Sequence, residues 1–480
     1  MDEEYEQCTN SAADSAEGGT SAGDASEHTY HEEFDMSKKG VNSRVLTLAL
    51  PALVELLLVQ LCTMMGTMMV GRLGPWAISA VGYCSQPKLL VQAVFIALNT
   101  GSTALISRAK GEENKDLAHR ILQQSILLSL VLSIVISIAG FMSAEAMVVF
   151  MGASEDYIIE AATKYMEIQM VGFVFNALTL TITACLRGVG KTKESMVYNL
   201  VANIVNVALN YALVYGNWGF PEMGVVGSSL ATVIGQTVAF AIAVVVILKK
   251  DDYLELKFKG LFKLDMPIIN RMVRVGGPAM GEQVIIRAGM MIFTKTITSL
   301  GSDAFATHQI AGNLLTMTYN TGQAFGIAAT TLTGQSLGRR DVEAAKTYTL
   351  TCRRYGTMCS VLLAASFILF GKQLAMMFTD DMSIVTEAAK MLLIVAFIQP
   401  LQTSQLIING SLRGAGDTMV VAVITFIGVL LIRPALSIFS INVLNMGLTG
   451  AWAATAIDQG LRSTVSYFRF KSNRWTTIKV

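Results

Sequence analysis

The feature that most constrains this chain is an internal duplication. The segment Pro51–Glu55 recurs 227 residues later as Pro278–Glu282, and each copy lies in an apolar run long enough to cross a bilayer. Order and spacing kept over several blocks exclude a chance match, and duplications of this kind in membrane chains are typical of transporters, which bind their ligand where the halves meet. The other repeated blocks are Leu73-Gly74 with Leu300-Gly301, Leu186–Gly190 with Leu412–Gly416, and Met223–Gln236 with Met446–Gln459.

Composition indicates that the bilayer is the solvent of most of the chain. Of its 480 residues, 52% are hydrophobic and 15% are charged, whereas soluble domains carry about 25% charged residues. We therefore predict an all-α polytopic membrane protein with 12 transmembrane helices, arranged as two repeat-related six-helix lobes. The predicted spans are 45–68, 77–105, 121–141, 157–184, 195–215 and 226–248, then 275–298, 304–333, 352–370, 384–411, 419–440 and 448–468.

These spans divide the chain into five parts. Residues 41–250 form the predicted N-terminal lobe and residues 275–470 the C-terminal lobe, with a cytoplasmic linker at 251–274 and a cytoplasmic tail at 471–480. Residues 1–40 are predicted to be a disordered acidic tail, because the first 35 carry eleven Asp or Glu and no Lys or Arg. This segment lacks the basic start and apolar core of a signal peptide.

The distribution of basic residues predicts the orientation. The tails and the loops after even-numbered helices hold 27 of the 36 Lys and Arg, whereas the opposite loops hold two, Arg72 and Lys372. By the positive-inside rule, both termini and the even loops are expected on the cytoplasmic side of the cell membrane.

The sequence gives no reason to propose an enzyme, a cofactor or a nucleic-acid partner. The six cysteines form no CxxC pair. Gly190-Lys191-Thr192 resembles the end of a phosphate-binding loop, but Cys185 stands where that motif needs its first glycine. Gly414–Asp417 resembles a protease motif, but its repeat counterpart carries Lys191 in place of the aspartate. We interpret both segments as turns between helices, in which glycine allows the reversal and Arg187 and Arg413 face the cytoplasm.

Two carboxylates inside the predicted spans are the principal candidate site residues. Glu55 and Glu282 occupy matching depths, four residues after a proline that removes a backbone donor and loosens the helix. An ionisable group near the bilayer centre costs about 2.5–3.5 kcal/mol, and a carboxyl in apolar surroundings can take up and release protons or hold a cation. The alternative is an ion pair with a base on another helix, for which the candidates are Lys88, Lys295 and Arg433.

Further polar residues in the spans are candidates to line a pathway. Four asparagines spaced 4, 3 and 4 residues apart share one helical stripe, which must face protein or water. Interhelical hydrogen bonding and the lining of a hydrated chamber explain this stripe equally well. Asp458 and Arg462 have the spacing of a same-face ion pair. The candidate pathway residues are Asn199, Asn203, Asn206, Asn210, Gln283 and Arg433.

Over residues 40–470 the chain resembles the multidrug and toxic compound extrusion (MATE) family. The resemblance implies two six-helix lobes facing each other in a V, which export amphipathic, often cationic drugs in exchange for protons or Na⁺. It also implies that Glu282 is a coupling residue and the candidate position for Na⁺. The motifs that carry it are Pro51–Glu55, Met69–Gly74, Pro278–Gln283, His308–Ala311, Ala328–Gly338 and the two Leu-Arg-Gly-x-Gly turns.

Two positions depart from the family pattern. Gly66 and Asn210 stand where similar proteins often have aspartates tied to proton coupling in the N-terminal lobe. This shifts our expectation toward Glu282, with Glu55 as the first-half substitute. We expect a monomer that exports small organic molecules across the cytoplasmic membrane. The alternatives are a flippase of lipid-linked precursors, which would need a basic chamber, and a membrane receptor that does not transport.

Overall fold

We describe a computed structural model in which residues 36–249, 253–256, 263–379 and 381–478 are placed. Of the predicted disordered tail at 1–40, residues 1–35 lie outside these residues, and the last three residues form the start of the first helix instead. All regular structure in the described part of the chain is helical, and the chain forms twelve long helical segments, as predicted. The first half holds α1 Lys38–Gly71, α2 Pro75–Gly111, α3 Lys115–Met142, α4 Ala144–Phe150, α5 Asp156–Val189, α6 Thr192–Tyr215, the short 3₁₀ turn η1 Asn217–Gly219 and α7 Gly224–Leu248.

The second half repeats this order. It holds α8 Met266–Thr298, α9 Ser302–Gly338, α10 Val342–Met376, α11 Met382–Gly414, α12 Thr418–Thr425, the π-helical turn η2 Phe426–Ile432, α13 Arg433–Asn442, α14 Gly447–Lys471 and the 3₁₀ turn η3 Arg474–Thr477. Within the described residues, nine helical segments are both long and apolar enough to cross a membrane. Helices α8, α9 and α14 are equally long but carry more polar residues.

The structure departs from the predicted elements at several boundaries. Helix α8 begins at Met266, inside the predicted linker, because Asp265 caps it by accepting a hydrogen bond from the Ile268 amide. The predicted helix at 419–440 is divided by η2, and the short helix α4 was not predicted. These features depend on helix packing and helix capping, and the length of an apolar run in the sequence gives no information on either.

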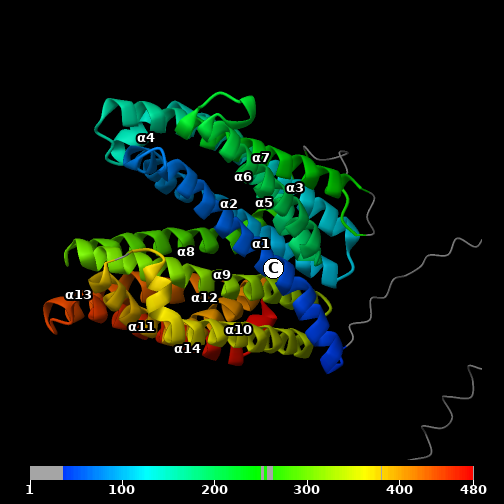
Figure 1. The fold of residues 1–480 in the computed structure, drawn as a ribbon. Helices are drawn as coiled ribbons and strands as arrows, with labels where there is room; N and C mark the ends of the chain where they lie inside the picture. The colour runs from blue at the N-terminus through cyan, green and yellow to red at the C-terminus, as the bar shows by residue number, and fades with distance from the viewer. Residues whose placement is uncertain (1–35, 250–252, 257–262, 380, 479–480) are drawn as a thin grey trace, which may run out of the picture. The chain divides into compact units, whose positions relative to one another are not determined.

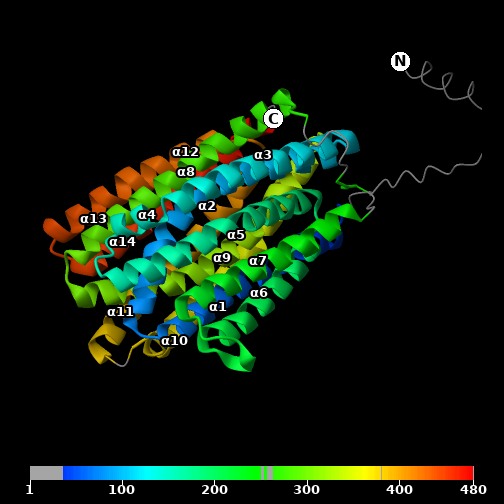
Figure 2. The same ribbon diagram turned by 90° about the horizontal axis from the view of Figure 1, so that it is seen from above.

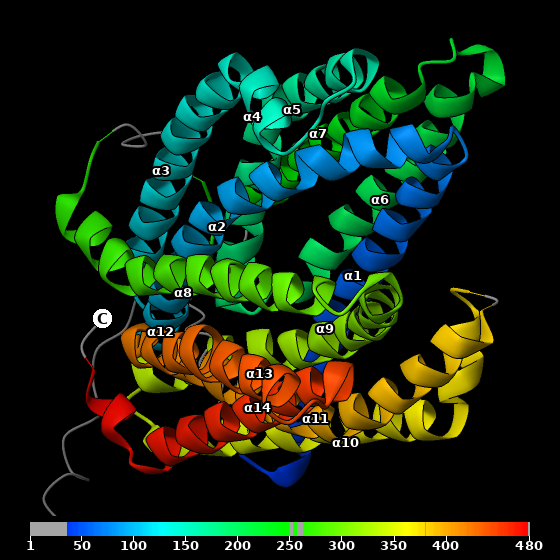
Figure 3. The ribbon, with the colours of Figure 1, turned by 90° about the vertical axis from the view of Figure 1, so that its left-hand side faces the viewer.

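The two halves form two groups of helices. In Figure 1, α2–α7 lie above and α10–α14 below, with α1, α8 and α9 between them. Seen from above, the long helices run along one common direction (Figure 2). Figure 3 shows α8 beside α2 and α9 beside α1, so the lobes meet through these four helices.

Glycines allow the lobes to approach closely at one end of the bundle. The Cα atom of Gly338 in α9 lies 2.9 Å from the position of a Cβ built on Gly111 of α2, and that Cβ would overlap the carbonyl oxygen of Gln335. We call this contact between residues 101–111 of α2 and residues 331–338 of α9 the interlobe crossing. Nearby, Gly101 of α2 packs in the same way on the backbone of Met272 in α8.

We expect Gly111→Ala to destabilise the protein, because the added methyl group must push two helix backbones apart. The cost of such overpacking is about 1–3 kcal/mol, and it should appear as a lower unfolding temperature in detergent. Gly66→Ala is the matched control, since no described atom lies within 4 Å of a Cβ built there. Equal unfolding temperatures for both variants would contradict the close contact.

The segment after α14 is packed rather than free. The Trp475 side chain is fully buried, stacks on Phe470 at 5.2 Å between ring centroids, and donates its indole N–H to the Phe470 carbonyl. Arg108 of α2 donates a 3.0 Å hydrogen bond to the carbonyl of Ile478. The chain's last described residues therefore connect the C-terminal lobe to the end of α2.

Candidate functional site

Glu282 is buried in the C-terminal lobe and bound to an arginine. It lies one turn after Pro278 in α8, and its side chain is 4% exposed. Nη2 of Arg413, in the last turn of α11, lies 2.7 Å from one carboxylate oxygen and 2.8 Å from the other. The Thr425 hydroxyl, at the end of α12, donates a further bond of 3.2 Å. Three helices therefore converge on one carboxylate.

Glu55 has a matching position in the N-terminal lobe. Its side chain, in α1, is 6% exposed, and Nη2 of Arg187 in the last turn of α5 lies 2.8 Å from Oε1. Asn199 of α6 donates a 2.6 Å hydrogen bond to the same oxygen, and Ser195 donates a 3.3 Å bond to Oε2. This carboxylate is also held by three helices.

The two ion pairs are related by the internal duplication, since both members of each pair come from repeated motifs. We predicted that Arg187 and Arg413 face the cytoplasm, and this was wrong. Gly190 and Gly416 do form the predicted turns with φ of 94° and 90°, but each arginine precedes its turn and points back into its lobe, where it is only 17–18% exposed. The sequence did contain a signal for these ion pairs, because both repeats carry a glutamate in the first motif and an arginine in the Leu-Arg-Gly-x-Gly motif.

The bases proposed as partners of the carboxylates have other contacts. Lys88 of α2 donates a 2.8 Å hydrogen bond to Gln169 of α5, Lys295 is exposed near the end of α8, and Arg433 binds Asp458. The structure therefore shows the alternative of an ion pair with a base on another helix, but the base is not one of these three candidates. A buried arginine at the end of a neighbouring helix fills that role in both lobes.

The asparagine stripe of α6 makes contacts of two kinds. Asn199 reaches across to Glu55, whereas the amides of Asn203 and Asn210 donate to carbonyls one turn earlier on the same helix, at 2.9 and 3.0 Å. Asn206 packs on the α7 backbone at Gly235. The stripe thus faces protein along part of its length, and Asn210, 2% exposed, lies inside the lobe. Gln283, next to Glu282, is half-buried.

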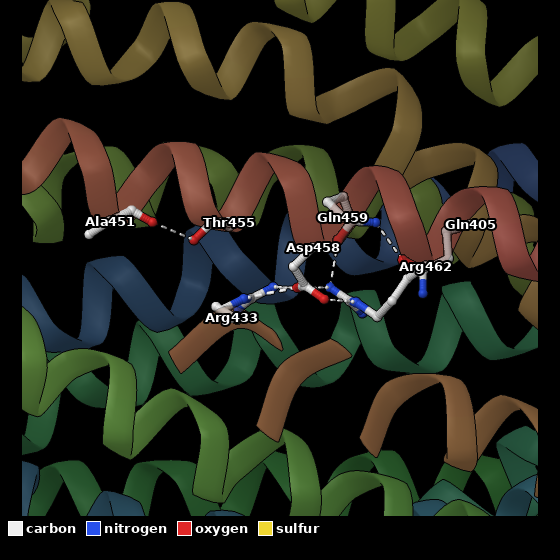
Figure 4. A network of polar contacts seen from close by, with 7 residues as sticks. All are labelled: Gln405, Arg433, Ala451, Thr455, Asp458, Gln459 and Arg462. Atoms are coloured by element: carbon white, nitrogen blue, oxygen red, sulfur yellow. Dashed lines mark hydrogen bonds and ion pairs between the residues drawn. The ribbon is translucent and has the colours of Figure 1, made fainter. Parts of the chain in front are cut away.

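Arg433 belongs to a charged network in the C-terminal lobe (Figure 4). Asp458 of α14 is unexposed and receives Arg433 at 2.8 and 3.0 Å, while Arg462 contacts it at 2.9 and 3.0 Å. Gln459, hydrogen-bonded to Arg462, also donates to Gln405 of α11. The expected Asp458–Arg462 pair is present, and Arg433 joins α13 to α14 through the same carboxylate.

This arrangement places a paired negative charge inside each lobe. Taking two charges out of water costs several kcal/mol per ion, and only close pairing and added hydrogen bonds offset that cost. Each glutamate is neutralised by one arginine, so a proton or metal cation that binds there competes with the arginine for the carboxylate. For Na⁺, the carboxylate of Glu282 and the hydroxyl of Thr425 would supply oxygen ligands. Among the described residues, no three His, Cys, Asp or Glu side chains converge on a common point.

Comparison with known proteins agrees with this architecture. The chain is 29% identical to a probable multidrug resistance protein NorM of Thermotoga maritima over 91% of its own length and 93% of that protein's. It is 27% identical to the multidrug resistance protein MdtK of Proteus mirabilis, over 80% and 84% of the two chains. A solved outward-facing structure of a multidrug resistance MATE family transporter of the MOP superfamily superposes with a TM-score of 0.86 at 21% identity, covering 91% of this chain and 97% of the other.

The family model describes both halves of the chain. The model named MatE matches residues 51–212 and again residues 278–439, and the two matches are offset by the same 227 residues as the proline-glutamate motifs. Together they cover more than half of the sequence. Two copies of one module, each with its buried glutamate-arginine pair, make this chain a member of the MATE family of membrane transporters and not an enzyme.

Proposed function

We propose that this chain is a secondary active antiporter that exports amphipathic, cationic small molecules across the cytoplasmic membrane in exchange for H⁺ or Na⁺. The observation that carries the proposal is the buried Glu282–Arg413 pair, which places an exchangeable negative charge inside a lobe of a transporter. The names of its relatives, which are multidrug resistance proteins, support drugs and toxins as the substrate class.

In this proposal, Arg413 is the cation that occupies Glu282 when no coupling ion is bound. A proton or Na⁺ that reaches the carboxylate replaces the guanidinium, and Arg413 then has to find another environment. Since Arg413 lies in the last turn of α11, its displacement moves the end of that helix relative to α8 and α12. The energy of the ion gradient thereby acts on helix positions.

Glu55 offers the same chemistry in the N-terminal lobe. It has one guanidinium, one amide and one hydroxyl as partners, so it is the carboxylate that stands in for the aspartates absent at Gly66 and Asn210. We propose Glu282 as the main coupling residue, because the resemblance to the family assigns that role to this position.

The orientation that we propose places both termini in the cytoplasm. The start of α1 and the end of α5 meet at Leu48 and Gly190, and the last described residues contact the end of α2. This end of the bundle therefore includes the interlobe crossing, and its loops carry most of the basic residues. The positive-inside rule places such an end in the cytoplasm.

The test is transport in everted membrane vesicles. A fluorescent organic cation should accumulate when a proton or Na⁺ gradient is imposed, and varying the two gradients independently identifies the coupling ion. Vesicles without the protein are the control. Binding of the cation without gradient-dependent uptake would contradict antiport and favour a receptor.

One observation favours the flippase alternative as a second candidate. Asp458 is shared by Arg433 and Arg462, so this network carries one positive charge in excess inside the lobe, and an anionic group such as a pyrophosphate would complement it. Gradient-independent transfer of a fluorescent lipid-linked pyrophosphate between bilayer leaflets, with no uptake of organic cations, would establish that alternative.

A further inference from the structure

Beside the interlobe crossing, two hydrogen bonds join α9 of the C-terminal lobe to the end of α5 in the N-terminal lobe. Thr331 of α9 donates a 2.9 Å bond to the carbonyl oxygen of Arg187, and Gln335 donates a 3.0 Å bond to the carbonyl oxygen of Gly188. Both donor side chains belong to the C-terminal lobe and are buried, at 0% and 3% exposure. Hydrogen bonds shielded from water are stronger than exposed ones, so the end of α5 is firmly attached to α9.

The residue that accepts the first of these bonds also carries the N-terminal ion pair. The guanidinium of Arg187 is fixed by Glu55 of α1, and its Nε atom is buried without a hydrogen-bond partner among the described residues. Losing the charge of Glu55 would leave a buried guanidinium unpaired, which is strongly unfavourable. Arg187 would then move, and its carbonyl and that of Gly188 would move with it.

Among the residues that the structure describes, the C-terminal pair has no such connection to the opposite lobe. The repeat positions of Thr331 and Gln335 are Ala104 and Arg108 of α2. Ala104 has no side-chain donor, and Arg108 binds the carbonyl of Ile478 instead of the segment around Arg413. The duplicated ion pairs are therefore unequal, because the pair in the N-terminal lobe is the one joined to the opposite lobe.

We infer that Arg187 is a positioning residue for the interlobe crossing, and that a proton or cation at Glu55 loosens the crossing through it. While Glu55 holds Arg187, the carbonyls of residues 187 and 188 stay aligned with Thr331 and Gln335, and the crossing stays closed. This rests on the proposed function only in requiring that this end of the bundle open during transport.

The test measures access to the crossing directly. Ser107 of α2 is unexposed and packs on Gly334 of α9, so a Ser107→Cys variant without the native cysteines reports opening by its rate of reaction with a water-soluble thiol reagent. We expect Glu55→Gln, Arg187→Gln and Thr331→Val each to raise this rate about tenfold, the effect of losing one or two hydrogen bonds. Thr330→Val is the matched control, because the Thr330 hydroxyl bonds, among the described residues, to the carbonyls of Gly326 and Gly410 in its own lobe, and we expect the rate of the Ser107→Cys parent.

Conservative variants separate positioning from general damage. Arg187→Lys keeps the charge and Thr331→Ser keeps the hydroxyl, so both should return the reaction rate toward that of the parent. The inference is overturned if Glu55→Gln and Arg187→Gln react at the parent rate while Thr331→Val reacts faster, or if Thr331→Val itself has no effect. The reagent needs no ion gradient, so failure of antiport and failure of this inference are separate results.

Discussion

Glu282→Gln should abolish gradient-driven uptake of organic cations in everted vesicles, reducing it to the level of vesicles without the protein. The substitution keeps the size of the side chain and one oxygen acceptor, but it removes the negative charge for which Arg413 and a coupling ion compete. Without that charge, the coupling ion no longer binds at residue 282 and no longer displaces Arg413. Substrate movement is then uncoupled from the ion gradient.

The matched control for this prediction is Glu343→Gln. Glu343 is 81% exposed and pairs with Lys346 at the surface, so its loss should leave transport unchanged. Uptake that is undiminished in Glu282→Gln protein would show that the Glu282–Arg413 pair is a fixed structural contact and that coupling lies elsewhere.

Asp458→Asn should produce the largest loss of stability. Asp458 is unexposed and is the shared partner of Arg433 and Arg462, so removing its charge leaves two buried guanidinium groups facing each other. Breaking a single buried pair costs about 3–5 kcal/mol, and we expect a fall in the unfolding midpoint of purified protein that corresponds to at least this amount.

The control is Glu387→Gln, which removes a surface pair with Lys390 and should cost less than about 1 kcal/mol. The double variant Asp458→Asn/Arg433→Gln should recover part of the loss, because one cation then remains instead of two. A midpoint for Asp458→Asn equal to that of the control would mean that water reaches these arginines.

The sequence was sufficient to predict the helical lobes and the helices in which both glutamates lie. Apolar run length reports which segments enter a bilayer, and the repeat makes each half a check on the other. The ion pairs were not predicted, because Arg187 and Arg413 lie close to glycine turns and were taken for loop residues. Their direction depends on how α5 and α11 pack against α1 and α8, which one sequence does not specify.

The polar contacts within each lobe could also be predicted only in part. The stripe of asparagines in α6 was visible from spacing alone, but its contacts with Glu55 and with α7 require the fold. One ion pair of the network around Asp458 was predicted, because Arg462 follows Asp458 by four residues, the spacing of a same-face pair on a helix. Arg433 was not assigned to it because α13 follows a π-helical turn, and such a turn shifts the direction of every later side chain.

The buried position of Trp475 has a practical corollary for handling the protein. Removing the residues after Lys471 would remove the Trp475 ring that covers the apolar cluster including Phe470 and Leu337. It would also remove the backbone carbonyl to which Arg108 of the other lobe donates a hydrogen bond. A reporter or purification handle placed at this terminus therefore needs a spacer beyond residue 478, or the label itself would alter the behaviour it is meant to record.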